Sequence, residues 1–314
     1  MTQNQLQTTA RPATEGLTKE SIQLMSRAIS KNTRTAYGRA YRKFNEFRED
    51  RPVTDPLICE WLQEMDSRGL APSTIQLMLA GVVWAYRQQG VLVDTTRSSL
   101  VMKGIKRGDE AQQRGRGQQR GIRRAEVELL RRKLNTGKLR DLRDRAIVGL
   151  MSDGLLRGSE LIRLRARDVL HVQPGGTARI NLRRSKSDQD GEGAILFVGK
   201  PVADDVKAYV REGEIQPGDP LIQGISRGGN LSGRAMTIQG LNVTVKRLAN
   251  AHLEIAEGVS SHSFRIGTAQ SLASRGSGLV ELQNAGRWKS ADMPARYTRG
   301  QAASRGAVAR LLYP

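Results

Sequence analysis

The sequence predicts a mainly α-helical protein in two parts, a small helical bundle followed by a larger domain of helices around one small sheet. Helix caps and apolar positions at helical spacing recur over residues 17–106 and again over most of 122–314. Residues 107–121 are rich in Gly, Gln and Arg and have no apolar period, which is typical of a linker. Only residues 168–198 show short alternating pieces separated by turns, and these predict three antiparallel strands inside the second domain.

The first domain is expected to hold four helices before residue 90 and a fifth over 97–106, packed as a small bundle. Residues 1–16 are polar and aperiodic, so we expect them to be disordered. Gly69 and Gly90 are expected to end the third and fourth helices. The residues expected to cap or begin the first four helices are, in chain order, Thr18, either Asn32 or Thr33, Thr54 and Ser73.

The second domain is expected to begin with helices, to continue with the sheet and to end with helices again, which makes it an α/β domain. Caps and helical spacing before the sheet predict helices at residues 123–134, 139–154 and 156–169. After the sheet, helices are expected at residues 202–213, at 237–256 and from His262 onward.

Basic residues outnumber acidic ones by 51 to 31, which gives a net charge of +20 at pH 7. Nucleic acids are the abundant polyanions of a cell, so this balance favours a nucleic-acid partner. The positive charge is spread along the whole chain, which is typical of a protein that surrounds its polyanion, although a merely solvated basic surface is the alternative. The candidate DNA contacts are Lys31, Arg34, Arg39, Arg42, Lys43, Lys103, Lys106 and Arg107.

The composition also excludes several classes of site. A single cysteine, Cys59, excludes a disulfide framework and a zinc or iron–sulfur site held by thiolates. The chain has three histidines and no P-loop, dinucleotide fingerprint, HExxH or GxSxG motif, so we expect neither a metal nor a cofactor. The apolar runs are far shorter than the roughly 18–20 residues that span a bilayer. The first residues form no secretory signal, so we expect a cytoplasmic protein without a membrane partner.

Several polar and aromatic residues follow one another through the second domain in an order that is informative as a set. Each alone has an ordinary explanation: a cap or core imidazole, a surface lysine, an i,i+3 pair of Glu160 with Arg163, or a packed tyrosine. Together, in GLLRGSELIRL, RRSKSDQDGEG, SHSFRIGTAQ and AGRWKSADMPARYTRG, they resemble the tyrosine recombinase (phage integrase) family, most of all its Cre-like branch. The matching residues are Arg157, Glu160, Lys186, His262, Arg265, Trp288 and Tyr297.

The resemblance covers nearly the whole chain and implies the fold and chemistry of that family. Residues 17–106 would form the core-binding domain, which binds DNA, and 122–314 the catalytic domain. Tyr297 would attack a DNA phosphodiester whose oxygens are held by Arg157 and Arg265. Lys186 would protonate the leaving 5′-oxygen, with Lys200 as the alternative acid.

Further implications concern the rest of the site and the partners. His262 and Trp288 would complete the phosphate-binding shell, and Glu160 would hold a neighbouring residue. Neither metal nor ATP would be required, because a 3′-phosphotyrosyl bond keeps the energy of the broken phosphodiester. The partners would be double-stranded DNA with an inverted-repeat site and further copies of the chain, a dimer on one site and a tetramer on two. A last helix would dock on a neighbouring subunit or fold back on its own domain, through Val308, Leu311 and Leu312.

Two other functions stay open at this point. A topoisomerase-like or telomere-resolving enzyme would use the same residues on a single duplex, although 314 residues leave little room for additional domains. A non-catalytic basic DNA-organising protein would not need the complete set of motif residues that this chain carries. The resemblance further implies a bacterial or phage-encoded protein associated with the nucleoid.

Overall fold

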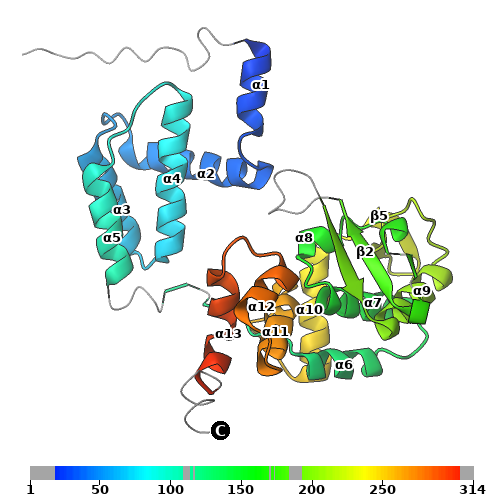
Figure 1. Cartoon of the computed structure of the whole chain (residues 1–314). Helices are drawn as coiled ribbons and strands as arrows, with labels where there is room; N and C mark the ends of the chain where they lie inside the picture. The colour runs from blue at the N-terminus through cyan, green and yellow to red at the C-terminus, as the bar shows by residue number, and fades with distance from the viewer. Residues whose placement is uncertain are drawn as a thin grey trace, which may run out of the picture. The chain divides into compact units, whose positions relative to one another are not determined.

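The computed structural model describes residues 18–108, 114–115, 117–169, 171–172, 174–183 and 193–304 (Figure 1). The chain divides into two compact units between Gly117 and Gln118, inside the segment expected to be a linker. None of the helices in the described ranges is long and apolar enough to cross a membrane.

The first unit is helical throughout its described residues. Its core is built from apolar side chains with edge-on aromatic contacts, as between Phe44 and Trp61, whose ring centroids lie 5.0 Å apart. The second and fourth helices pack closely because Gly81 has no side chain; a Cβ there would lie 2.7 Å from the Cβ of Ala40. The helices are α1 (Lys19–Arg27), α2 (Lys31–Arg48), α3 (Asp55–Ser67), α4 (Pro72–Gln88) and α5 (Thr96–Arg107).

Two of the predicted caps are confirmed and two predictions need correction. Thr18 and Thr54 accept hydrogen bonds from the first turns of α1 and α3, as expected. The cap of α2 is Ser30, whose extended backbone places its hydroxyl 3.2 Å from the backbone nitrogen of Thr33. Helix α4 begins at Pro72 and not at Ser73, because the fixed φ of proline suits the first helical position.

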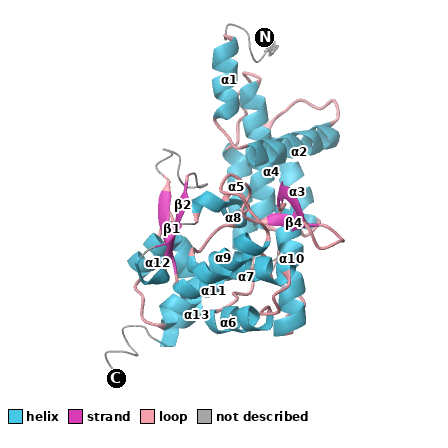
Figure 2. Ribbon diagram, turned by 90° about the vertical axis from the view of Figure 1, so that its right-hand side faces the viewer, coloured by secondary structure: helices cyan, strands magenta, loops and turns pink. Residues whose placement is uncertain are grey.

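The second unit holds a three-stranded antiparallel sheet in the order β1-β2-β3, which confirms the predicted sheet. Strands β1 and β2 lie side by side in Figure 2, and Arg179 of β2 lies opposite Phe197 of β3. The strands are β1 (His171–Val172), β2 (Ala178–Leu182) and β3 (Ala194–Val198). The helices are α6 (Arg124–Lys133), α7 (Leu139–Asp153), α8 (Gly158–Leu161), α9 (Lys200–Glu212), α10 (Ile238–Leu253), α11 (His262–Ser274), α12 (Leu279–Gly286) and α13 (Asp292–Ser304).

The sequence did not predict a second sheet, the antiparallel pair β4 (Gln223–Ile225) and β5 (Leu231–Ala235). Strand β5 is exposed along most of its length, so it lacks the apolar alternation that marks a half-buried strand.

The helix predicted over residues 156–169 is wrong. Only the single turn α8 and a 3₁₀ turn at Ala166–Asp168 form there. The helix stops because the backbone at Leu164 and Arg165 pairs with another segment: the nitrogen of Leu221 donates to the carbonyl of Leu164 at 2.8 Å.

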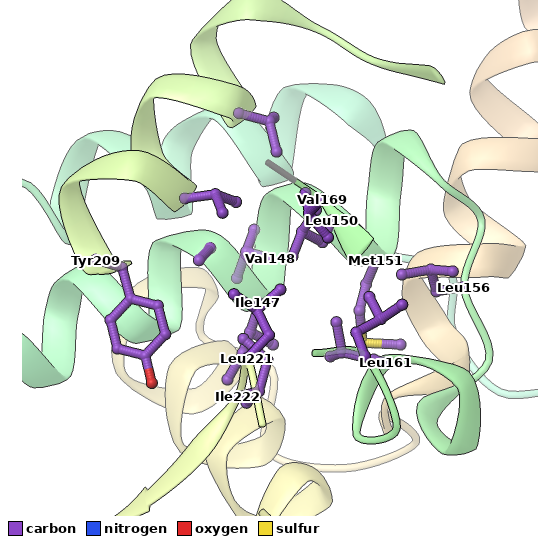
Figure 3. Close-up of a cluster of buried hydrophobic side chains, with 14 of the residues drawn as sticks. Ile147, Val148, Leu150, Met151, Leu156, Leu161, Val169, Tyr209, Leu221 and Ile222 are labelled. Carbon is purple, nitrogen blue, oxygen red and sulfur yellow. The ribbon is translucent and has the colours of Figure 1, made fainter. Parts of the chain in front are cut away.

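Helix α7 forms the centre of the second unit, and its carboxy-terminal half is buried on every side. Gly149 lets α9 approach, since a Cβ there would lie 2.6 Å from Val202. Figure 3 shows the surrounding cluster, which includes Ile147, Val148, Leu150, Met151, Leu156, Leu161, Val169, Tyr209, Leu221 and Ile222. The loop that follows α7 is therefore anchored to a closely packed helix.

The end of the segment expected to be a linker, at Arg120, packs on the second unit together with Ile122, the first residue expected of the catalytic domain. The side chain of Ile122 is fully buried, and its backbone nitrogen donates to the carbonyl of Ser263 at 2.9 Å. The backbone of Arg120 donates to Gly258 at 2.9 Å. Gly267 of α11 faces this segment so closely that a Cβ there would overlap the carbonyl of Ile122.

Candidate active site

The side chain of Tyr297, on α13, lies in a largely buried cluster of rings. Its hydroxyl oxygen is 2.8 Å from Nε2 of His262, the first residue of α11. Its ring makes edge contacts with His262 and with Trp288, at centroid distances of 5.7 and 5.9 Å. The side-chain amide of Gln270 donates to the Tyr297 carbonyl at 3.2 Å, which fixes this turn of α13 on α11. The phenol is thus held in one place, 6 % exposed.

Charge and burial set the protonation of this pair. Burial, and then the positive charges of Arg265 and Arg157, lower the pKa of His262, so its ring is neutral at pH 7. Burial raises the pKa of Tyr297, and nearby arginines oppose that shift only in part. The phenol therefore keeps its proton and can donate it to Nε2 of the neutral ring.

Arg265 lies one turn after His262 and is completely buried. Its terminal nitrogens donate to the backbone carbonyls of Leu155 and Gly286. Its guanidinium carbon lies 4.2 Å from the ring centroid of Trp288, a cation–π contact. Burial, followed by Arg157 and Arg287, lowers the pKa of Arg265 to about 9, so it remains charged at neutral pH. The nitrogen Nε of Arg265 has no hydrogen-bond partner among the described residues, and an anion would compensate this buried charge.

Arg157 stands in the loop between α7 and α8, and Glu160 holds it. Its Nη1 lies 2.6 Å from Oε1 of Glu160, and its backbone nitrogen donates to Oε2 at 2.9 Å. Burial by itself raises the pKa of Glu160. The hydrogen bond from the Arg157 backbone and the charges of Arg287 and Arg157 outweigh it, and the pKa is lowered. Glu160 is therefore an ionised carboxylate that pairs with these two arginines; the alternative pair with Arg163 is not the one formed.

Sequence reasoning missed Arg287. Its Nη2 lies 2.9 Å from the second carboxylate oxygen of Glu160, which is 127 residues away along the chain. The only signal in the sequence is its position directly before Trp288 in the motif AGRWKS.

The structure brings Arg157, Glu160, His262, Arg265, Trp288 and Tyr297 together, as the resemblance implied. Lys186 lies outside the described residues, as do Val308, Leu311 and Leu312. The alternative acid, Lys200, is an exposed residue of α9 whose Nζ lies 2.7 Å from Asp204. The described residues contain no cluster of three histidine, cysteine or acidic side chains that could hold a metal ion.

The candidate DNA contacts lie on two helices of the first unit and are all exposed. Helix α2 carries Lys31, Arg34, Arg39, Arg42 and Lys43, and α5 carries Lys103, Lys106 and Arg107. Among them, Lys106 donates to the side chain of Gln76 at 2.9 Å.

Comparison with known proteins agrees with this geometry. The model of the phage integrase family matches residues 120–304. The chain belongs to the phage integrase family, the tyrosine site-specific recombinases. The family confirms the resemblance seen in the motifs and makes the chain an enzyme of this class. Recombinase Cre of Escherichia phage P1 is 26 % identical over 279 residues, which is 83 % of this chain and 80 % of that protein.

Solved structures confirm the fold class. The XerH site-specific recombinase bound to a palindromic difH substrate matches with a TM-score of 0.66 and 17 % identity, over 88 % of this chain and 78 % of that one. The Tn1549 transposon integrase in complex with transposon right end DNA matches with a TM-score of 0.64 and 18 % identity, over 93 % and 97 %. The chain therefore shares the fold of these two proteins.

Proposed function

We propose that the chain is a site-specific DNA recombinase that cuts a strand by forming a 3′-phosphotyrosyl bond at Tyr297 and rejoins it to another duplex. The observation that carries this proposal is the 2.8 Å contact between the Tyr297 hydroxyl and His262, beside the buried Arg265. A nucleophile, a proton acceptor and a cation for phosphate thus meet on α11 and α13. A DNA substrate is supported by the net charge of +20 and by the DNA-bound relatives.

The first step needs removal of a proton from the phenol. An ordinary tyrosine has a pKa near 10, so roughly one molecule in a thousand is a phenolate at pH 7, a cost of about 4 kcal/mol. Burial raises the pKa of Tyr297 further, which makes a preformed phenolate rarer still. The neutral His262 ring, in contact with the hydroxyl, takes the proton as the oxygen attacks phosphorus.

The second requirement is stabilisation of the charge that builds on phosphorus. As the bond from Tyr297 forms and the bond to the 5′-oxygen breaks, negative charge gathers on the two non-bridging oxygens. Arg157, held by Glu160, and Arg265, held by two carbonyls, present fixed guanidinium groups to these oxygens. Trp288 packs against Arg265 and shields this cation from water. Lys186 gives its proton to the leaving 5′-oxygen, and Lys200 remains the alternative acid.

The third part of the proposal concerns assembly. A free 5′-hydroxyl of a second duplex attacks the phosphotyrosine, releases Tyr297 and so exchanges strands. Two duplexes present four such phosphodiesters, hence four protomers, a dimer on each inverted-repeat site. The palindromic substrate of XerH supports a site of this kind. The proposed compartment is the cytoplasm, because the substrate is the DNA of a bacterial nucleoid or of a phage.

Two surfaces are suited to the phosphate backbone. One is the exposed basic face of α2 and α5 in the first unit. The other is a hollow of about 460 Å³ in the second unit at the start of α10, lined by Arg140, Arg143, Arg234 and Arg247. The positive end of the α10 dipole lies at the same hollow, so the helix dipole and the arginines would both attract phosphates.

A covalent capture experiment tests this function. The protein is incubated in EDTA and without nucleotide with sheared DNA from the replicon that carries its gene, and stopped with detergent. Fragments that end just beyond the cleavage point lose their short leaving strand, which prevents resealing and preserves the adduct. We expect adducts at one recurrent sequence, absent with Tyr297→Phe. Adducts at random sequences, or strand passage confined to one duplex, would favour the topoisomerase-like alternative, and no adduct would favour the DNA-organising protein.

A further inference from the structure

Arg287 has a backbone conformation that side chains seldom adopt. It ends α12 with φ 55° and ψ 45°, in the left-handed region that favours glycine. Such a conformation persists only where the surroundings hold it. Here the side chain does so, since it is 13 % exposed and hydrogen-bonded through both of its terminal nitrogens.

The partners of Arg287 are the groups that hold the two phosphate-binding arginines. Its Nη2 pairs with Glu160, whose other carboxylate oxygen holds Arg157. Its Nη1 donates to the carbonyl of Gly154 at 3.1 Å, and its Nη2 to the carbonyl of Leu155 at 3.4 Å. The Leu155 carbonyl also accepts from Arg265.

The chain neighbours of Arg287 complete the same arrangement. The carbonyl of Gly286, just before it, accepts from Arg265, and the ring of Trp288, just after it, covers the Arg265 guanidinium. The left-handed turn at residue 287 makes both contacts possible, and a Cβ at Gly286 would overlap the Trp288 ring. Arg287 thus joins the Arg157 side of the site to the Arg265 side.

The charges give this arrangement a consequence for catalysis. Arg157, Arg265 and Arg287 face one carboxylate, Glu160, so the described groups leave two positive charges around the expected phosphate. Attack of a phenolate oxygen on a phosphodiester monoanion produces a phosphorane with two negative charges. Without Arg287, Glu160 would cancel one of the remaining two cations, so that only one net positive charge would face the phosphate.

We propose that Arg287 is a positioning residue for DNA cleavage: it neutralises Glu160 and fixes the loop at residues 154–157, so that Arg157 and Arg265 present their charge to the scissile phosphate. This inference rests on the proposed function. It adds a third arginine, on a different loop, that acts through the other two and does not touch DNA.

The experiment uses the DNA sequence recovered by covalent capture in two forms. One form has the natural scissile phosphate, and the other has an uncharged methylphosphonate at that position. Single-turnover adduct formation is measured for the wild type and for Arg287→Met. We expect the variant to lose roughly a hundredfold on the phosphate. We expect it to lose less than tenfold on the methylphosphonate, because the neutral group develops one negative charge fewer in the transition state.

Two further variants separate charge balance from simple packing. Glu160→Gln added to Arg287→Met restores two net positive charges, so we expect the double variant to cleave the phosphate at least tenfold faster than Arg287→Met. Arg287→Lys should recover part of the rate, since it keeps the charge. Arg131→Met is the matched control: Arg131, on α6, is 8 % exposed against 13 % for Arg287, and it pairs with Asp205 of α9 at 2.7 Å. We expect its loss to lower the melting temperature but to affect both substrates alike.

The outcomes are distinct. Equal losses on the two substrates, or no recovery in the double variant, would overturn the role of Arg287 while leaving the proposed function intact. A wild type that forms no adduct with any DNA would overturn the proposed function itself.

Discussion

The neutral imidazole of His262 leads to a pH experiment on Tyr297. In the wild type the base is available above the pKa of His262, which burial and two arginines lower below the usual 6.5. Cleavage should therefore be independent of pH from about 6.5 to about 8, and above that it should fall for wild type and variant alike as Arg265, with a pKa of about 9, loses its charge. In His262→Gln the amide still fills the space, but it cannot accept the proton, and only the phenolate fraction of Tyr297 can react.

The magnitude follows from the phenol. With a pKa of at least 10, the reactive fraction is roughly one in a thousand at pH 7 and rises tenfold with each pH unit. The ratio of wild-type to variant rates should thus be about a thousand at pH 7, or about 4 kcal/mol, and about ten at pH 9.

The assay is single-turnover adduct formation on a duplex whose leaving oxygen is replaced by sulfur, so that protonation of the leaving group does not limit the rate. His252→Gln, on α10, is the matched control and should keep the wild-type profile. A pH-independent profile for His262→Gln, with less than a tenfold loss, would refute the assignment of His262 as the base.

Three further predictions concern binding and stability. Tyr297→Phe should bind the recovered site with wild-type affinity in a gel-shift titration and form no adduct, because only the nucleophile is removed; a persistent adduct would contradict this. Gly267→Ala should lose about 3 kcal/mol or more in urea unfolding, since the added Cβ overlaps Ile122, whereas Gly300→Ala, with no atom within 4 Å, should be neutral or gain up to about 1 kcal/mol. Asp55→Ala should cost the first unit about 1–2 kcal/mol, because this buried carboxylate accepts from the backbone of Arg97 and Ser98 and so caps α5; an unchanged unfolding midpoint would refute that role.

Local chemistry made most of the helices predictable. Thr18 and Thr54 cap the helices expected of them, and the alternating pieces form the expected sheet. The failures occur where a distant segment decides. Residues 164–165 leave the helix because they pair with residues 220–221, and β5 carries no apolar alternation because it is exposed.

The candidate site shows the same limit. The motif residues could be found because each stands in a recognisable local context, such as SHSFRIG around His262 and Arg265. The contacts that orient them could not, because Arg265 is held by two backbone carbonyls and Glu160 by an arginine 127 residues away. Hydrogen bonds to backbone carbonyls leave no trace in residue identity.

The segment before α6 at residues 120–122, which packs on the second unit, has a practical consequence for anyone preparing that unit alone. A fragment cut at the start of α6, at Arg124, would omit Ile122 and leave bare the seam along Gly267 on the helix that carries His262 and Arg265. A fragment that begins at Gln118 or earlier keeps Ile122 packed against Gly267, so the fragment should start several residues before α6.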